Sequence, residues 1–120
     1  MAKGEITHIE FPADDPERAK KFYSAVAGWE FNTMGDYPNY WLFRTAEQAG
    51  GGIGKRGDTV GKEIRVYISV DRLEDAITAA TANGGTVTVE PADVPGQGRY
   101  AVVKDTEGSE IGLWESSPQG

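Results

Sequence analysis

Short stretches with alternating apolar and polar residues recur along the chain, and each predicts a β-strand. Residues 5–11 form the first of them. Asp14 or Asp15 can then cap a helix, because Pro16 suits its first turn and apolar residues follow at spacings of three and four. Gly28 ends this helix. Further strands are expected at residues 29–32, 40–44 and 53–55, with a glycine-rich loop over residues 45–52.

The second half of the chain shows the same order of patterns. A strand is expected at residues 64–70, and Asp71 is expected to cap a helix that runs to about Asn83. Gly84 and Gly85 end that helix. The remaining predicted elements are strands at 86–90, 100–104 and 110–115, a loop rich in proline and glycine at 91–98, and a hairpin turn at 105–108.

These two halves are a repeat of one βαβββ module. Asp15 precedes Gly28 by 13 positions, and Asp71 precedes Gly84 by the same number. Each half also ends in an Ile-Gly pair, at residues 53–54 and 111–112. We therefore expect one domain over residues 1–120, made of modules at about 4–56 and 62–116 with a linker at about 57–61.

Composition narrows the possible partners. The 120 residues suit one compact domain, and the formal net charge of −7 argues against nucleic acid and against an anionic membrane. The chain has no cysteine, so disulfides and thiolate metal sites are excluded. It shows neither an apolar run long enough for a membrane span nor a signal-peptide pattern, and a cytoplasmic protein is expected.

Alternation also predicts which strand residues share a face. His8, the only histidine, lies on the same face as Glu10. If both point inward, Glu10 can pair with Arg65 or hold the tautomer of His8. Arg65 and Tyr67 alternate with apolar residues that should pack under the helix, and Gly112 and Trp114 do the same in the last strand. We expect these polar faces to line a cavity.

The order of short motifs resembles that of the vicinal oxygen chelate superfamily, which includes glyoxalase I, bleomycin-resistance proteins and extradiol dioxygenases. Within it, the chain looks most like single-domain proteins related to lactoylglutathione lyase. The resemblance implies an α+β fold in which curved mixed sheets of two βαβββ modules form a half-open barrel around a cavity. The motifs are Thr7–Phe11, Asp15–Ala19, Phe22-Tyr23, Gly28-Trp29, Gly84-Gly85, Asp105–Gly108 and Ile111–Glu115.

The resemblance also implies where a metal would bind. Metal-dependent members place one ligand on the first and one on the last strand of each module. In this chain those positions are His8, Gly52 or Gly54, Arg65 and Gly112. Glycine has no donor, and arginine stays charged and repels a cation. We therefore expect no metal and no cofactor, with His8 as the one candidate ligand and a rearranged His8–Glu10 site as an alternative.

The leading hypothesis is a protein that binds a planar or anionic small molecule without a metal. Three alternatives stay open: a metal-dependent lyase, isomerase or dioxygenase that uses His8; a metal-free enzyme with His8 or Glu10 as general base; and a purely structural dimer. A second copy of the chain is the expected protein partner. The candidate ligand-binding residues are His8, Glu10, Tyr40, Arg65, Tyr67, Gly112 and Trp114.

Overall fold

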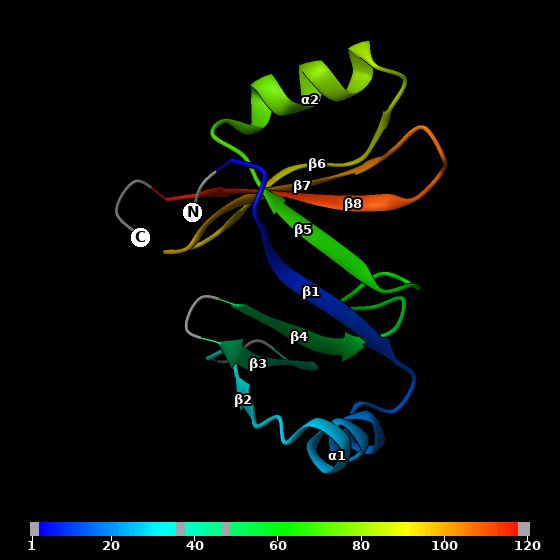
Figure 1. Ribbon diagram of the computed structural model, residues 1–120, viewed down its shortest axis with the longest axis vertical. Coiled ribbons are helices and arrows are strands. Elements are labelled where there is room, and N and C mark those ends of the chain that lie inside the picture. The colour runs from blue at the N-terminus through cyan, green and yellow to red at the C-terminus, as the bar shows by residue number, and fades with distance from the viewer. Residues whose placement is uncertain (1–2, 36–37, 47–48, 118–120) are drawn as a thin grey trace. The chain divides into compact units, whose positions relative to one another are not determined.

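The computed structural model describes residues 3–35, 38–46 and 49–117 (Figure 1). Two compact units are present, and each is built from four strands and one helix. The N-terminal unit comprises Thr7–Arg65, and the C-terminal unit comprises Val66 onward together with the first residues of the chain up to Ile6. The predicted α+β class with two βαβββ repeats is confirmed by this element order. The module boundaries and the linker stay a prediction.

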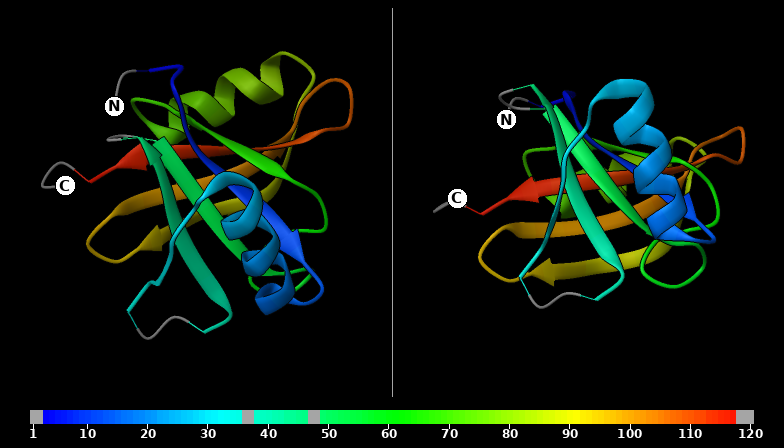
Figure 2. Two further views of the ribbon diagram at one scale, coloured as in Figure 1. Left: turned by 60° about the horizontal axis from the view of Figure 1, so that its bottom comes forward. Right: turned by 90° about the horizontal axis from the view of Figure 1, so that it is seen from below.

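The N-terminal unit contains a four-stranded mixed sheet in the order β2-β3-β4-β1. β1 and β4 are parallel, whereas β2 with β3 and β3 with β4 are antiparallel. Helix α1 packs on β1 and β4 of this sheet (Figure 2). The elements are β1 (Ile6–Ala13), α1 (Pro16–Ala27), β2 (Phe31–Thr33), β3 (Tyr40–Ala46) and β4 (Ala49–Lys55).

Helix α1 begins and ends where the sequence predicts. The Asp15 side chain accepts a hydrogen bond from the Arg18 backbone N–H at 3.1 Å, and Pro16 follows in the first turn. At the other end Gly28 adopts φ = 73°, a left-handed conformation that glycine adopts without a steric penalty. Local residues alone therefore set both ends of this helix.

Aromatic rings fill the space between α1 and its sheet. The Trp29 ring stacks on Phe43 with centroids 4.1 Å apart, and Tyr23 stacks on Trp29 at 5.3 Å. Ile53 and Phe43 lie at the centre of this cluster and are 0% and 6% exposed. Trp29, directly after the helix end, therefore packs as part of the core of this unit.

The prediction of a loop over residues 45–52 is wrong: β3 runs to Ala46, β4 starts at Ala49, and residues 47–48 lie outside the described part. Glycine normally weakens a strand, but here neighbouring groups lie too close for side chains. A Cβ on Gly51 would lie 1.9 Å from the backbone oxygen of Ile9, and one on Gly50 would lie 2.2 Å from that of Phe43. The glycines therefore permit close approach on both sides of β4.

The C-terminal unit repeats the plan with the strand order β5-β8-β7-β6. β5 and β8 are parallel, and the other two pairs are antiparallel. Helix α2 covers one face of this sheet (Figure 1), where Leu73, Ala101 and Leu113 are buried together. The elements are β5 (Arg65–Ser69), α2 (Leu73–Ala82), β6 (Thr86–Val94), β7 (Gly98–Lys104) and β8 (Glu110–Ser116).

The prediction of a loop from Pro91 to Gly98 is also wrong, because β6 continues through Pro91 to Val94 and β7 begins at Gly98. β6 ends the strand order of this unit and pairs with β7. An outer strand tolerates proline because one side of its backbone does not pair. The pairing register shifts between Val89 and Ala92, so an irregularity surrounds the proline.

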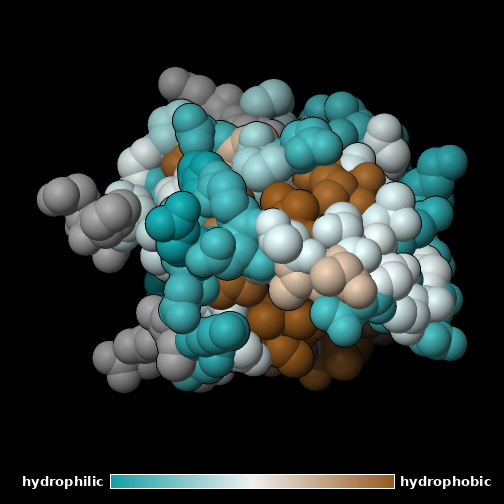
Figure 3. All heavy atoms as spheres, turned by 90° about the horizontal axis from the view of Figure 1, so that it is seen from above, coloured by the Kyte–Doolittle hydropathy of each residue, from teal (hydrophilic) through white to brown (hydrophobic). Residues whose placement is uncertain are grey.

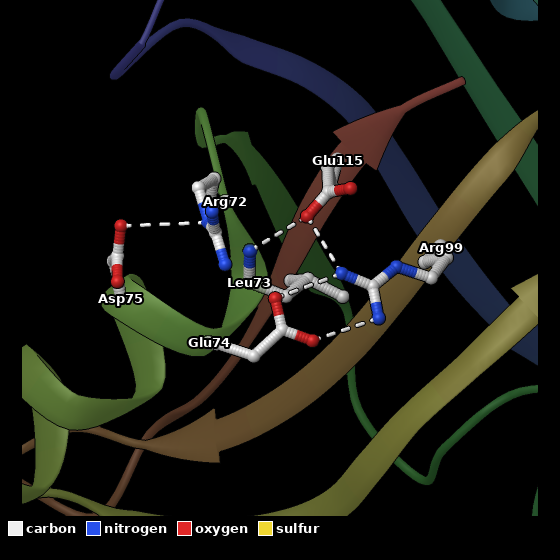
Figure 4. Close-up of polar contacts among 6 residues, drawn as sticks. All are labelled: Arg72, Leu73, Glu74, Asp75, Arg99 and Glu115. Carbon is white, nitrogen blue, oxygen red and sulfur yellow. Dashed lines mark hydrogen bonds and ion pairs between the residues drawn. The ribbon is translucent and has the colours of Figure 1, made fainter. Parts of the chain in front are cut away.

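Helix α2 does not use Asp71 as its cap, contrary to the sequence prediction. The N-cap residue is Arg72, which makes no side-chain capping bond. Instead, the Leu73 backbone N–H donates to Glu115 Oε1 of β8 at 2.8 Å, as Figure 4 shows. Arg99 of β7 donates to the same oxygen at 2.8 Å and forms two 2.9 Å hydrogen bonds with Glu74. A distant strand therefore caps this helix.

The surface seen in Figure 3 is mixed, with hydrophilic residues along one flank and hydrophobic residues gathered near the middle.

The Asp105 side chain accepts hydrogen bonds from the backbone N–H groups of Glu107 and Ser109, at 2.8 and 3.0 Å, which confirms the predicted turn. Among the described residues, no helix is long and apolar enough to cross a membrane.

Candidate functional site

A polar network lies in the N-terminal unit, on the sheet face opposite α1. Alternation along β1 sends Phe11 and Ala13 toward the helix, so His8 and Glu10 point to the other face. The Tyr40 hydroxyl joins them: it lies 2.8 Å from His8 Nε2 and donates to Glu10 Oε2 at 3.1 Å. The predicted shared face of His8 and Glu10 thus corresponds to a hydrogen-bonded group.

Gly52 makes this network possible. β4 lies between β3, which carries Tyr40, and β1, which carries His8 and Glu10. A Cβ on Gly52 would lie 2.2 Å from the Tyr40 hydroxyl oxygen and 2.3 Å from Cζ of the same ring. The ring therefore crosses β4 at the space that a side chain would occupy. Tyr40 is 6% exposed, so it acts here as a buried bridge.

Arg65 completes the network at the end of the unit. Its guanidinium Nη1 lies 3.7 Å from Glu10 Oε1, and both side chains are 12% exposed. Gly61 leaves room for this group, because a Cβ there would lie 2.6 Å from Arg65 Nη2. The arrangement joins a buried cation, a carboxylate, a phenol and an imidazole. Such a set can bind a charged group or hold a proton at a chosen atom.

Burial sets the charge of His8. Its pKa is lowered from the ordinary histidine value of 6.5 to about 4, because removing the ring from water disfavours the charged form. His8 is therefore neutral at pH 7. A neutral imidazole has one N–H donor and one acceptor nitrogen, so its tautomer decides which atom meets a neighbour.

The C-terminal unit carries an aromatic surface on the face opposite α2. Tyr67, Tyr100 and Trp114, here called the aromatic shelf, come from the neighbouring strands β5, β7 and β8. Tyr67 and Tyr100 meet edge to face with centroids 6.3 Å apart, and Tyr100 pairs with Trp114 across the strands. The half-buried Trp114 indole N–H donates to Ser116 Oγ at 3.1 Å. This hydrogen bond helps to fix the position of the Trp114 ring.

The parallel strand pairs settle which glycine of β4 corresponds to Gly112. Glu10 lies opposite Gly52 in β1 and β4, and Tyr67 lies opposite Gly112 in β5 and β8. Gly52, and not Gly54, therefore matches Gly112. A Cβ on Gly112 would lie 2.3 Å from the Tyr67 ring, so a tyrosine again occupies the space of a missing side chain.

The residues at the ligand positions implied by the resemblance do not fit a divalent metal. Such an ion needs three or four converging donors at about 2.0–2.3 Å. Tyrosine rings fill the side-chain space at Gly52 and Gly112, and Arg65 brings a positive charge. In the part of the chain that the structure describes, no three His, Cys, Asp or Glu residues cluster to hold a metal.

The structure groups the seven predicted ligand-binding residues in two sets. His8, Glu10, Tyr40 and Arg65 are linked in the N-terminal unit, whereas Tyr67, Gly112 and Trp114 meet in the C-terminal unit. Sequence reasoning missed Tyr100, although it alternates with buried Ala101 and so faces away from α2. It also missed the part played by Gly52, which depends on strand register.

Curated relatives resemble the chain over nearly its whole length. The candidate glyoxylase CFP32 of Mycobacterium bovis and of Mycobacterium tuberculosis is 32% identical over 119 residues, covering 97% of this chain and 46% of the relative. The chain thus spans less than half of that protein. A glyoxylase-like domain-containing protein of Didymella fabae is 34% identical, with 88% of this chain and 89% of the relative covered.

Solved structures show the same fold. A hypothetical protein of Bacillus halodurans superposes with a TM-score of 0.74 at 15% identity and 99% coverage of both chains. The methylmalonyl-CoA epimerase of Mycobacterium tuberculosis superposes with a TM-score of 0.67 at 18% identity, over 99% of this chain and 94% of that one. These identities support the fold alone.

A family model covers most of the chain. The description of that model is Glyoxalase/Bleomycin resistance protein/Dioxygenase superfamily, and it matches residues 5–113. The repeated βαβββ order and the mycobacterial relatives agree with this match. The chain therefore belongs to the glyoxalase/bleomycin resistance protein/dioxygenase superfamily.

Proposed function

We propose that this chain is a small-molecule-binding member of its superfamily with a degenerate metal site, and that its guest is planar or anionic. One observation carries the proposal: tyrosine rings occupy the side-chain space at both Gly52 and Gly112. Carboxylates at those positions would need the space that Tyr40 and Tyr67 now fill. This occupied space supports binding of a guest without a metal.

The aromatic shelf supports a planar guest. Trp114 is half-buried, its indole N–H is bound to Ser116, and a Cβ on Gly98 would lie 2.9 Å from its ring. A ring that is already held in place loses little conformational freedom when a flat molecule stacks on it. Tyr67, at 6% exposure, supports the shelf from below more than it offers a free face.

Arg65 supports an anionic guest. Its Nη1 lies 3.7 Å from Glu10 Oε1, and the side chain is 12% exposed, so the guanidinium is a largely buried positive charge. A carboxylate or phosphate on a guest can compete for the guanidinium, which offers five donors. The planar and anionic requirements reside in different units, so they are tested separately.

The experiment combines metal analysis with calorimetric titration. The purified chain is analysed for metal by mass spectrometry as isolated and after exposure to Ni²⁺, Zn²⁺, Mn²⁺ and Fe²⁺, and is then titrated with naphthoate and with uncharged naphthyl alcohol. We expect no retained metal. The uncharged alcohol tests the aromatic shelf, where Trp114→Ala should weaken binding about tenfold. Naphthoate tests the carboxylate contact at Arg65 in the other unit, where Arg65→Gln should give a smaller loss. Trp41→Ala and Arg44→Gln are the matched controls.

Near-stoichiometric metal that His8→Ala abolishes would overturn the proposal. So would failure of naphthoate and of a wider thermal-shift panel of flat and anionic compounds to bind. Binding that is equally weak in Trp114→Ala and Trp41→Ala would remove the shelf from the site.

Proton transfer without a metal is a second candidate function, favoured by the His8–Tyr40–Glu10 hydrogen bonds. His8 is neutral at pH 7, as a general base must be, while burial lowers its pKa to about 4 and so makes the ring a weaker base than a free imidazole. Solvent deuterium entering a bound guest, followed by NMR, tests this function. Exchange that His8→Ala abolishes while binding persists supports an enzyme; exchange unchanged in that variant excludes His8 as the base.

We propose further that the chain pairs with a second copy of itself. Phe22 and Val26 lie one helical turn apart on α1 and are 58% and 68% exposed. The mycobacterial relatives are about twice as long as this chain and so have room for a second similar domain. Light scattering after size-exclusion chromatography should give a dimer that Phe22→Ser dissociates and Lys21→Ser leaves intact. A wild-type monomer would refute the pairing.

A further inference from the structure

The order of donors and acceptors along the polar network is determined by the Tyr40 hydroxyl. A phenol has one proton to donate and lone pairs to accept with. Tyr40 donates that proton to Glu10 Oε2 at 3.1 Å, and it lies 2.8 Å from His8 Nε2. Since the proton is already committed, the second contact needs His8 Nε2 to carry the hydrogen.

Arg65 determines the direction of this chain of bonds. A protonated Glu10 would be able to donate to Tyr40, and Tyr40 would then donate to an unprotonated His8 Nε2. The guanidinium 3.7 Å from Glu10 Oε1 instead favours the carboxylate, which only accepts. Both side chains are 12% exposed, so water screens this attraction weakly.

We propose that Tyr40 is a positioning residue that holds His8 in the Nε2–H tautomer, so that Nδ1 is the acceptor and proton-accepting atom of the ring. This role rests on the proposed function and refines it. A guest that meets His8 at Nδ1 must offer an N–H or O–H group. A carbonyl or carboxylate oxygen in that place would face a lone pair and be repelled.

Gly52 is required for the same arrangement. The Tyr40 hydroxyl reaches β1 only because β4 carries no side chain where the ring crosses, at 2.2 Å from an ideal Cβ position. Gly54 differs, because a Cβ there would first meet Thr59 Oγ1 and Val60 Cγ1, each at 2.6 Å, and lies 3.2 Å from Tyr40 Cδ1. A single glycine of β4 thus permits the contact that sets the tautomer of a histidine on β1.

The test is direct because the chain has a single histidine. Protein labelled with ¹⁵N on the histidine ring is placed at pH 8, where His8 is neutral, and long-range ¹H–¹⁵N correlation spectra identify which ring nitrogen is protonated. We expect Nε2–H to dominate by about tenfold in the wild type and the ratio to fall toward that of a free histidine side chain in Tyr40→Phe. Tyr23→Phe, the same change in the aromatic cluster under α1, should leave the ratio unchanged.

Two results would overturn the inference. One is a wild-type spectrum dominated by Nδ1–H, and the other is a tautomer ratio that Tyr40→Phe does not alter. Glu10→Gln is a second variant, expected to raise the Nδ1–H fraction because an amide can donate back to Tyr40. Since no guest is present in these spectra, the tautomer can fail while binding holds, or hold while binding fails.

Discussion

The two units share one backbone plan, yet the faces opposite their helices carry different chemistry. In each unit a parallel strand pair sets a glycine of the last strand opposite a residue of the first: Gly52 opposite Glu10, and Gly112 opposite Tyr67. A tyrosine fills the glycine's empty space in both, but it crosses from β3 in one unit and comes from β5 in the other. Between the two βαβββ repeats, the corresponding positions are His8 and Arg65, Glu10 and Tyr67, Tyr40 and Tyr100, Gly52 and Gly112, and Gly54 and Trp114.

This difference shows how one repeated fold can carry a polar surface in one copy and an aromatic surface in the other. The register provides equivalent places in both units, and the side chains alone decide what each place does. In the N-terminal unit the Tyr40 hydroxyl hydrogen-bonds to His8 and Glu10. In the C-terminal unit the Tyr67 ring packs against another aromatic ring, that of Tyr100. Equivalent positions of the two repeats therefore carry a polar network in one unit and a group of aromatic rings in the other.

The largest expected effect comes from filling the two glycine spaces. A Cβ on Gly112 would lie 2.3–2.6 Å from three atoms at the base and edge of the buried Tyr67 ring. A Cβ on Gly52 meets the far end of Tyr40, 2.2 Å from its hydroxyl oxygen, which can swing more easily. We expect Gly112→Ala to lower the free energy of unfolding by about 3 kcal/mol and Gly52→Ala by about 1–2 kcal/mol, measured by urea denaturation.

A control for this comparison is the double variant Gly112→Ala with Tyr67→Ala. Removing the ring should make the added methyl nearly neutral, so the two changes should be strongly non-additive. Equal costs at Gly52 and Gly112 would show that the two tyrosines are held with equal rigidity.

Mild acid should affect the polar network before the charged cluster at α2. The pKa of His8 lies at about 4 in the folded chain and near 6.5 when unfolded, so the unfolded state binds more protons between these values. The contribution of neutral His8 to the free energy of unfolding is therefore present above pH 6.5 and is lost as the pH falls toward 4. We expect a loss of about 2 kcal/mol between pH 8 and pH 5, read from urea unfolding at each pH.

His8→Gln is the matching variant, because an amide can still donate to Tyr40 but does not titrate. Its unfolding free energy should be flat from pH 8 to pH 5. Below pH 4.5 both proteins should lose stability, since hydrogen bonds from Arg99 lower the pKa of Glu74 to about 2, and bonds from Leu73 and Arg99 lower that of Glu115. A parallel decline of both proteins above pH 5 would rule out His8 as its source.

The two helix starts should differ in cost. Glu115→Ala removes the acceptor for the Leu73 N–H and for Arg99, and we expect a loss of about 2 kcal/mol. Asp15→Ala removes one capping bond at the exposed start of α1, and about 1 kcal/mol is expected. Chemical denaturation measures both, with exposed Glu90→Ala as the control. A loss at Asp15 that exceeds the loss at Glu115 would contradict the tertiary cap.

The smallest effect is expected on the helix side of the sheets. Lys20 Nζ lies 4.0 Å from the centre of the Trp41 ring and 2.9 Å from Glu17. In the C-terminal unit the position that corresponds to Trp41 is the fully buried Ala101, which offers no ring to a cation. Lys20→Met keeps the apolar stem but loses the charge, at a cost of about 0.5 kcal/mol in thermal or urea unfolding. Lys21→Met, at the exposed neighbouring residue, should cost nothing measurable.

Local chemistry was enough to determine several features from the sequence. The Asp15, Pro16 and Gly28 signals place both ends of α1, because caps and left-handed glycine depend on near neighbours. Alternation placed His8 and Glu10 on one face and the repeat gave the order of elements, since both depend on backbone period alone. Family membership followed from the same ordered motifs.

Only the tertiary structure decided features that join distant segments. The glycines of β4 predicted a loop from the sequence alone. They lie in a strand because Ile9, Phe43 and Tyr40 come too close for side chains there, and only the folded chain shows this. The cap of α2 comes from Glu115, more than 40 positions along the chain, so no local pattern could reveal it. The bond from Tyr40 to His8 likewise needs the register of three strands, which side-chain packing sets and local pattern does not.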